Sequence, residues 1–147
     1  MKFHTFIPFV EHLGFELLKF EDGEAEIAVT LREELCNSWS VAHGGVTMTL
    51  LDVTMAHAAR ATGLEGVGQS NGIGVVTIEM KTSFMRPGLG RLVAKGKRVH
   101  GTASLAFCEA HVFDEKGALV AQASGTFKYL KGLPAGGRKI MRNNASD

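Results

Sequence analysis

The sequence predicts an α+β domain in which an antiparallel sheet of about six strands wraps around one long central helix. Two strand-like stretches come before one long helix-forming stretch, and four more strand-like stretches follow it, joined by short turns. The apolar residues of the helical stretch point in nearly every direction around its axis, which is typical of a helix buried on most sides. A chain of 147 residues also has the length of one domain with one core.

A short helix and a hairpin are predicted at the start of the chain. Residues 8–13 form the helix, which Gly14 ends, and 15–20 then reads as an extended strand. The turn Glu21-Asp22-Gly23 follows it. Residues 24–31 alternate polar and apolar side chains with a period of two, as expected for a strand with one buried face.

The long helix is predicted at residues 46–61. The preceding stretch 32–42 has no regular periodicity, and Gly44 and Gly45 then open the helix. The helical stretch consists of good helix formers and contains neither proline nor glycine. Gly63 is the expected end of the helix.

The second half of the chain reads as four strands with short connections. The residues between them favour chain reversal, as in Arg86-Pro87-Gly88 and in Asp114-Glu115-Lys116-Gly117. The last residues, 131–147, carry glycine, proline and scattered charge, so we expect a folded domain over 1–130 and then a flexible tail. The four strands are expected at 75–84, 91–100, 104–114 and 119–130.

The overall composition argues against several classes of protein. Sixteen Lys and Arg against fifteen Asp and Glu give a formal charge of +1, so we expect no nucleic-acid partner and no basic membrane patch. No run approaches the ~20 apolar residues of a membrane span, and the start of the chain lacks the cleavage site of a signal peptide. Cys36 and Cys108 therefore read as free thiols of a cytoplasmic protein.

Asp52 lies in the middle of the apolar helix, where an ionised carboxylate is costly unless it is paired, hydrogen-bonded or open to a ligand. A structural explanation is a hydrogen bond to Thr49 or to a strand amide, or an ion pair at an interface. A catalytic explanation gains weight from Gly44 and Gly45, whose N–H groups are unhindered at the positive end of the helix and suit a polarised carbonyl oxygen. Both explanations stay open at this point.

The spacing of Gly44 and Asp52 restricts how they work together. The two residues are eight positions apart, which corresponds to roughly 12 Å along a helix at ~1.5 Å per residue. One carbonyl carbon cannot lie within ~3 Å of both groups. We therefore hypothesise that Gly44 of one subunit works with Asp52 of its partner, so that the functional unit is a homodimer.

Three segments of the chain form a specific pattern. The first runs from Asn37 through His43-Gly44-Gly45 to Asp52, the second is 77–88 with Met-Arg-Pro near its end, and the third is 121–127. Over about residues 10–130 the chain resembles the hotdog-fold thioesterases of the phenylacetate-degradation and 4-hydroxybenzoyl-CoA type. The resemblance implies a hotdog fold, hydrolysis of an acyl-CoA thioester, and a dimer of dimers, that is a homotetramer. Attack by water needs no cofactor.

The resemblance also implies roles for individual residues. Asp52 matches the catalytic carboxylate, acting as general base or nucleophile, and Gly44 matches the backbone donor that polarises the carbonyl. His43 and Asn37 match residues that position the carbonyl and the water. Thr77 matches a Ser or Thr near the carboxylate. The candidates for substrate and CoA binding are Gly45, Phe84, His100, Gly101, Thr102, Ser104 and Lys128.

Several of these residues also have a structural interpretation. His43 is consistent with a cap at the helix entrance, and Asn37 is consistent with a turn. Thr77 is consistent with a polar strand position on the face opposite Ile78 and Met80. The residues alone leave both interpretations open.

Other polar residues are weaker candidates. Lys95, Lys97 and Arg98 form either a basic cluster for the phosphates of CoA or an ordinary solvated strand face. His57 lies five residues past Asp52 and reads as a satisfied, partly buried histidine. His4, His12 and His111 have no partners at metal-ligand spacing, so no metal is expected.

Two alternatives to a thioesterase remain, a hotdog dehydratase or hydratase and a non-catalytic acyl-CoA sensor. The double glycine after His43 disfavours the first, and Asp52 disfavours the second. No Gly-x-Ser-x-Gly elbow is present, which disfavours an α/β-hydrolase. The acyl group stays open between an aromatic and a medium-chain aliphatic one. The side chains considered for its pocket are Trp39, Met48, Met55 and Phe84.

Overall fold

The computed structural model describes residues 1–61 and 74–130, and its strands pair into one antiparallel sheet. The elements are α1 (Pro8–Leu13), β1 (Glu16–Glu21), β2 (Glu24–Thr30), the 3-10 helix η1 (Glu33–Leu35), α2 (Gly44–Arg60), β3 (Gly74–Phe84), β4 (Arg91–Gly101), β5 (Leu105–Phe113) and β6 (Leu119–Leu130). The order across the sheet is β1-β2-β4-β5-β6-β3, so β1 and β3 form its edges. The predicted six-stranded sheet with one long helix is confirmed, with boundaries within two residues. Gly63 and the predicted tail at 131–147 lie outside the described residues.

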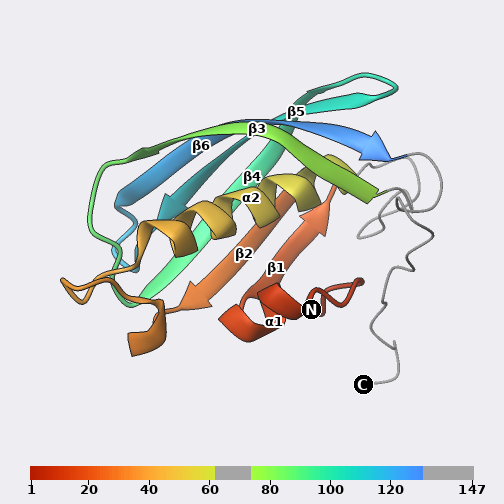
Figure 1. Ribbon diagram of the computed structural model, residues 1–147. Helices are drawn as coiled ribbons and strands as arrows, with labels where there is room; N and C mark the ends of the chain where they lie inside the picture. Colours follow the sequence, from red (N-terminus) through yellow and green to blue (C-terminus); the bar gives the residue numbers. More distant parts are fainter. Residues whose placement is uncertain (62–73, 131–147) are drawn as a thin grey trace.

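Helix α2 lies diagonally across one face of this sheet, between α1 and β1 on one side and β3 on the other (Figure 1). The side of α2 that faces the sheet is fully buried at Leu50, Leu51 and Met55. Small residues on the sheet permit a close approach, since a Cβ atom at Gly96 would lie 2.9 Å from Cγ2 of Thr54. The interface between helix and sheet is therefore a tightly packed core.

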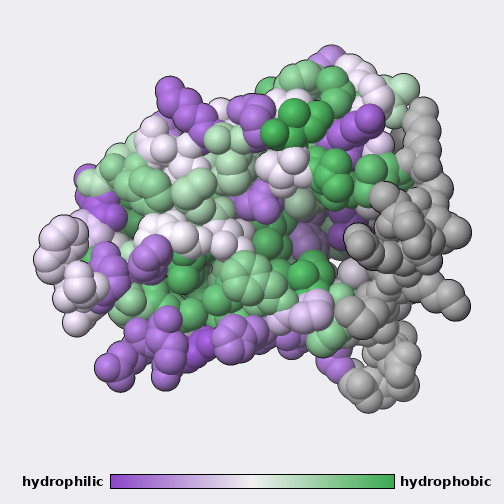
Figure 2. All heavy atoms as spheres, in the orientation of Figure 1, coloured by the Kyte–Doolittle hydropathy of each residue, from purple (hydrophilic) through white to green (hydrophobic). Residues whose placement is uncertain are grey.

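The opposite side of α2 is open in the described part of the chain. Val46, Thr49 and Val53 are partly exposed, and Met48 is 39% exposed. The expectation of a helix buried on most sides is wrong for a single chain, because the sheet covers only one side of it. Figure 2 shows apolar surface over α2 and β3 on this face of the molecule. Met55, considered for the acyl pocket, belongs to the core instead.

Two other segments hold the carboxyl end of α2. The N–H of Gly23, in the turn between β1 and β2, donates to the carbonyl of Ala61. The hydroxyl of Tyr129 on β6 donates to the carbonyl of Ala59 at 2.6 Å. These bonds satisfy carbonyl groups that a helix end otherwise leaves without partners.

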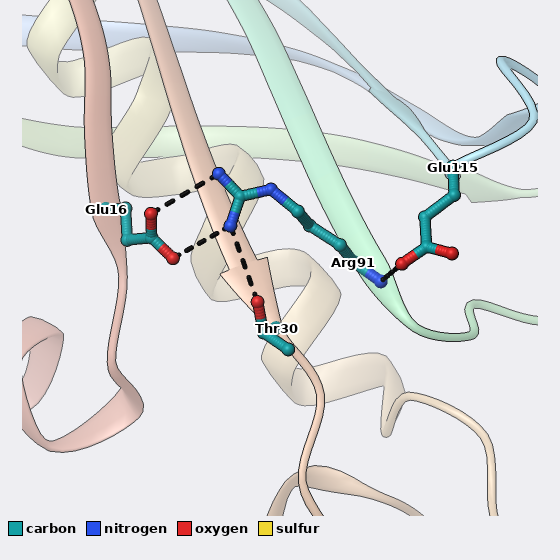
Figure 3. Close-up of polar contacts among 4 residues, drawn as sticks. All are labelled: Glu16, Thr30, Arg91 and Glu115. Carbon is teal, nitrogen blue, oxygen red and sulfur yellow. Dashed lines mark hydrogen bonds and ion pairs between the residues drawn. The ribbon is translucent and has the colours of Figure 1, made fainter.

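An exposed ion pair ties the edge strand β1 to β4 (Figure 3). The guanidinium of Arg91 donates to Glu16 at 2.8 Å and to the hydroxyl of Thr30 at 3.4 Å. The backbone N–H of Arg91 donates to Glu115 in the turn between β5 and β6. The hydrogen bond from Arg91 lowers the pKa of Glu16. Because both side chains are solvated, water screens the pair and its effect on stability is small.

His57 lies on the buried side of α2 and is enclosed by aromatic rings. Its Nδ1–H donates to the carbonyl of Val53 at 2.7 Å, and the rings of Phe3 and Phe20 pack edge-on against the imidazole. The interpretation of His57 as a satisfied histidine is confirmed, and its burial is more complete than expected. Burial disfavours the charged imidazolium and lowers the pKa of His57 to about 4.

The buried His57 is expected to make stability depend on pH. The unfolded chain binds a proton at this imidazole below pH 6.5, whereas the folded chain stays neutral down to about pH 4. Between these values the unfolded state binds more protons, so this group alone lowers the free energy of unfolding by about 3 kcal/mol as the pH falls. We expect urea unfolding of His57→Phe to show a much shallower pH dependence. Phe3→Leu keeps the imidazole and should keep the slope, and an equal slope in His57→Phe would contradict this account.

Candidate active site

His43 caps the amino terminus of α2. Its Nδ1 accepts a hydrogen bond from the N–H of Gly45 at 2.9 Å, and its carbonyl accepts from the N–H groups of Val46 and Thr47. The structural interpretation of His43 as a cap is therefore confirmed, and the N–H of Gly45 is occupied by it. The N–H of Gly44, the first residue of the helix, has no partner among the described residues and lies at the positive end of the helix dipole.

The cap also fixes which nitrogen of His43 carries the proton. Because Nδ1 accepts from Gly45, a neutral His43 carries its proton on Nε2, which is then a donor. The imidazole is exposed, so this donor is accessible to a ligand. The start of the helix thus offers two donors, the N–H of Gly44 and the Nε2–H of His43.

The loop before the helix is shaped by Asn37. Its side-chain oxygen accepts from the N–H groups of Trp39 and Val41 at 2.9 and 3.4 Å, so Asn37 forms the turn that its structural interpretation expects. The N–H of His43 donates to the carbonyl of Leu35, which fixes the end of the loop. Trp39, considered for the acyl pocket, is 83% exposed near the middle of this loop. A role of the Asn37 side-chain nitrogen in positioning water stays a prediction.

Asp52 lies two turns further along α2, on the open side. The hydroxyl of Thr77 on β3 donates to Oδ1 of Asp52 at 2.6 Å, while Oδ2 receives no hydrogen bond from the described residues. Thr49 is not the partner of Asp52, because its hydroxyl donates to the carbonyl of Gly45. A half-buried carboxylate with one fixed and one free oxygen is suited to act as general base or nucleophile.

A β-bulge in β3 turns Thr77 toward the helix. Thr77 and Glu79 pair with consecutive residues of β6, so Ile78 is an extra residue between them. Beyond the bulge, the alternation of side chains between the two faces of β3 is shifted by one residue. Met80 therefore pairs with Gly125, which faces the core. The expectation that Thr77 and Met80 lie on opposite faces is therefore wrong. Neither glycine nor proline marks the bulge, so it leaves little signal in the sequence.

The amino terminus of α2 meets the other end of β3. A Cβ atom at Gly44 would lie 3.7 Å from the ring of Phe84, the last residue of the strand. Phe84 of β3 thus lies beside Gly44, and Thr77 of the same strand is bonded to Asp52. The helix separates these contacts by roughly 12 Å, so the donor and the carboxylate of one chain do not converge on one carbonyl carbon.

Four residues expected to bind CoA lie in the β4–β5 hairpin, which extends beyond the rest of the sheet in Figure 1. The hydroxyl of Thr102 accepts from the N–H of Ser104 at 3.3 Å, which shapes the turn. Gly101 leaves room for Arg98, since a Cβ atom there would lie 2.9 Å from its Nη1. The ring of His100 packs against an aromatic neighbour on β5. These contacts explain the residues structurally, and CoA binding by them stays a prediction.

The basic residues considered for CoA phosphates do not form one cluster. Lys95 and Lys97 pair with glutamates of neighbouring strands at 3.8 and 3.4 Å on the exposed outer face of the sheet. Arg98 donates instead to the hydroxyl of Tyr129, at 3.3 Å. The solvated strand face is therefore the correct interpretation of the two lysines. Lys128 has no ion pair among the described residues and stays a candidate.

Two kinds of feature are absent from residues 1–61 and 74–130. No group of three or more His, Cys, Asp or Glu side chains is placed to hold a metal ion. No helix combines the length and the apolar character that a membrane span requires.

The fold and this arrangement of groups define an enzyme of the acyl-transfer class, because a free amide donor suits a carbonyl oxygen and a fixed carboxylate suits attack on its carbon. A sequence profile of the Thioesterase superfamily matches residues 40–121, more than half of the chain, and this range includes Gly44, Asp52 and Thr77. The chain belongs to the Thioesterase superfamily and is a thioester hydrolase.

Individual relatives agree with this assignment. YigI of Escherichia coli, a medium/long-chain acyl-CoA thioesterase, is 26% identical over 140 residues, covering 82% of this chain and 84% of that protein. A mutant structure of the phenylacetic acid degradation protein PaaI of Thermus thermophilus is 30% identical with a TM-score of 0.73, covering 84% of this chain and 100% of that one. A conserved protein of Pseudomonas aeruginosa is 28% identical with a TM-score of 0.76, covering 86% and 96%. The predicted hotdog fold is confirmed.

Removal of the Thr77 hydroxyl is expected to slow the reaction without unfolding the protein. In Thr77→Val the carboxylate of Asp52 loses its fixed orientation. We expect kcat to fall by about ten- to a hundred-fold, the effect of one hydrogen bond to a charged group. Thr77→Ser keeps the hydroxyl and should keep most of the activity. Equal kcat in wild type and Thr77→Val, measured by release of the CoA thiol, would leave Thr77 a structural role only.

Proposed function

We propose that this protein hydrolyses acyl-CoA thioesters, with the carbonyl oxygen held by the N–H of Gly44 and the attack carried out through Asp52. The observation that carries this proposal is the unpartnered N–H of Gly44 at the positive end of α2. A backbone donor and the helix dipole together stabilise an oxyanion at this point. Thiolate is a competent leaving group, so no Ser-His-Asp triad is needed.

The reaction has two versions that this site supports. In the first, Asp52 takes a proton from water while the water oxygen attacks the carbonyl carbon, and the negative charge moves to the oxygen held by Gly44. The C–S bond then breaks, and the departing CoA thiolate takes up the proton from Asp52. In the second, Asp52 attacks the carbonyl carbon, the C–S bond breaks, and the CoA thiolate leaves as a mixed anhydride forms. Water then hydrolyses the anhydride, which releases the free acid and regenerates the carboxylate of Asp52, and the proton from water goes to the thiolate. Both versions need only water and the thioester, so we propose that no cofactor takes part.

Each active site is proposed to form between two chains. Strand β3 is an edge strand, and its unpaired edge is available to a second copy of itself. In an antiparallel pair centred on Lys81, Phe84 of one chain lies opposite the partner's Ile78, since the two residues lie three positions on either side of Lys81. Phe84 and Ile78 are 53% and 54% exposed, and this pairing covers both apolar side chains.

The same pairing brings the two halves of the site together. Gly44 lies beside Phe84, while Asp52 is bonded to Thr77, the residue next to Ile78. Gly44 of one chain then lies near the partner's Asp52. The two groups of one site thus come from different chains, so the separation of roughly 12 Å between Gly44 and Asp52 of the same chain no longer keeps them apart. A two-fold axis creates two such sites in the homodimer. Assembly of two homodimers into a homotetramer is proposed on the resemblance alone.

The acyl group is proposed to be aromatic or medium-chain aliphatic. YigI is a medium/long-chain acyl-CoA thioesterase and PaaI is a phenylacetic acid degradation protein, so the relatives include both chemistries. Phe84 and Met48 are exposed apolar side chains near these groups, because Phe84 lies beside Gly44 and Met48 lies four residues from both Gly44 and Asp52 on α2. An aromatic ring and a flexible thioether suit either kind of group.

A thiol-release assay tests the activity. The purified protein is mixed with acyl-CoAs that range from acetyl-CoA to palmitoyl-CoA, together with phenylacetyl-CoA, and the free thiol is followed with a colorimetric reagent. We expect turnover of at least one aromatic or medium-chain ester. Tight binding of acyl-CoA without hydrolysis would instead identify a sensor, and hydration of an enoyl-CoA without thiol release would identify a hydratase.

The protein is also proposed to work in the cytoplasm. Cys36 lies in the loop before α2, Cys108 is buried in β5, and both are free thiols. Burial raises the pKa of the Cys108 thiol to about 12, so this group stays protonated and unreactive. Free thiols persist in a reducing compartment, which supports this location.

A further inference from the structure

Met48 lies midway between the two ends of the candidate site. It follows Gly44 by four residues and precedes Asp52 by four, so the three residues form one stripe along α2. Both ends of this stripe lie next to β3, because Gly44 lies beside Phe84 and Asp52 is bonded to Thr77. Met48 itself is 39% exposed on the open side of the helix. An apolar side chain is therefore exposed between the amide donor and the carboxylate.

The symmetry of the proposed homodimer gives Met48 a special position. When Gly44 of each chain lies near the partner's Asp52, the point midway between these two residues lies close to the two-fold axis. That point on α2 is Met48. The same axis crosses the paired β3 strands at Lys81. The exposed thioether of one chain therefore faces the same side chain of the partner.

The orientation of the bound acyl-CoA determines which part of it contacts the two Met48 side chains. The CoA part of the substrate is large and charged, so it stays in water, while the apolar acyl group gains by entering the interface. With the carbonyl oxygen at the N–H of Gly44, the acyl group runs along α2 toward Met48, which is about 6 Å further along the helix. Met48 is thus the first apolar side chain of the stripe that a growing acyl chain meets.

We propose that the two Met48 side chains meet at the two-fold axis and form a shared end wall of both acyl pockets, so that Met48 sets the length of the acyl chain that the enzyme accepts. This inference rests on the proposed function and on the homodimer. Short acyl groups and a single ring end before the wall. Methionine is unbranched and flexible, so it also moves aside for a chain of medium length.

Substrate length tests the wall directly. We compare kcat/KM for hexanoyl-CoA, decanoyl-CoA and tetradecanoyl-CoA in the wild type, Met48→Ala and Met48→Phe. We expect the ratio of tetradecanoyl-CoA to hexanoyl-CoA to rise by roughly ten-fold or more in Met48→Ala and to fall by a similar factor in Met48→Phe, which is the range that added methylenes produce in an apolar pocket. Unchanged ratios in both variants would overturn the inference. Thiol release by the wild type would then still support the proposed function.

A cross-link tests the position of the axis without any substrate. In a Cys36→Ser background, Met48→Cys places one thiol of each chain near the axis, and oxidation or a short bis-maleimide is expected to join two chains. Met85→Cys is the matched control, because Met85 is also exposed but follows the end of β3, away from Lys81. Cross-linking at Met85 but not at Met48 would overturn the inference, as would a dimer that cross-links at neither. A monomer without thiol release would overturn the proposed function itself.

Discussion

Asp52→Asn is expected to lower kcat by about a thousand-fold while the protein stays folded. The amide keeps the shape of the side chain and still accepts the hydrogen bond from Thr77, but it has no negative charge and takes no proton from water. The lost interaction belongs to the transition state, so KM should change little. The measurement is thiol release with the best substrate of the acyl-CoA panel. A kcat within about ten-fold of the wild type would remove Asp52 from the mechanism.

Mixed dimers show whether Asp52 acts on a substrate held by the other chain. A chain with Asp52→Asn keeps the amide donor of Gly44, and a chain with Gly44→Pro keeps the carboxylate. Co-refolding of equal amounts makes about half of the dimers mixed, and each has one intact site of two, so about a quarter of the wild-type activity should return. Each variant alone stays nearly inactive. If native mass spectrometry shows mixed dimers but no activity is regained, the hypothesis of a site shared between two chains is wrong.

Gly44→Pro is expected to lower kcat by about a hundred- to a thousand-fold, because it removes the N–H that holds the oxyanion. Proline is well tolerated at the first position of a helix, which Gly44 occupies. The preceding His43 has φ −60° and ψ 136°, the extended conformation that a residue before proline prefers. The substitution therefore deletes one donor with little change to the backbone.

Gly44→Ala is the matched control for this substitution. It keeps the N–H, and its Cβ atom would lie 3.7 Å from the ring of Phe84, which is an ordinary van der Waals contact. We expect this variant to keep kcat within about ten-fold of the wild type, and both variants to melt at similar temperatures. Equal losses of kcat in the two variants would show that the space beside Phe84, rather than the amide donor, limits the reaction.

The elements of this fold are readable from the sequence because local patterns determine local structure. The alternation in residues 24–31 and the uninterrupted helix formers in 46–61 predict β2 and α2 within two residues. The spacing of Gly44 and Asp52 along the sequence also settles one point about the site. Helix rise is nearly constant, so one chain cannot bring both groups to one carbonyl carbon.

The exposure of α2 cannot be read from its own sequence, because it depends on which sides of the helix the rest of the chain covers. The apolar pattern of the helix predicts burial on most sides, yet the described chain leaves one side open and exposes Met48. The apolar residue types are the same whether a sheet of the same chain or a second subunit covers them, so the residue type does not show which of the two buries it. The sequence therefore identifies the apolar surface, and only the tertiary structure separates the core from the open face.

For the chemistry of the site too, the sequence determines one part and the tertiary structure determines the other. Sequence alone determined which groups are present, namely the backbone N–H of Gly44, the imidazole of His43 and the carboxylate of Asp52. The tertiary structure decided that Thr77 holds Asp52, because the bulge at Ile78 turns this hydroxyl toward the helix. Such a bulge depends on the register between β3 and β6, which are far apart in the chain, so no local pattern determines it.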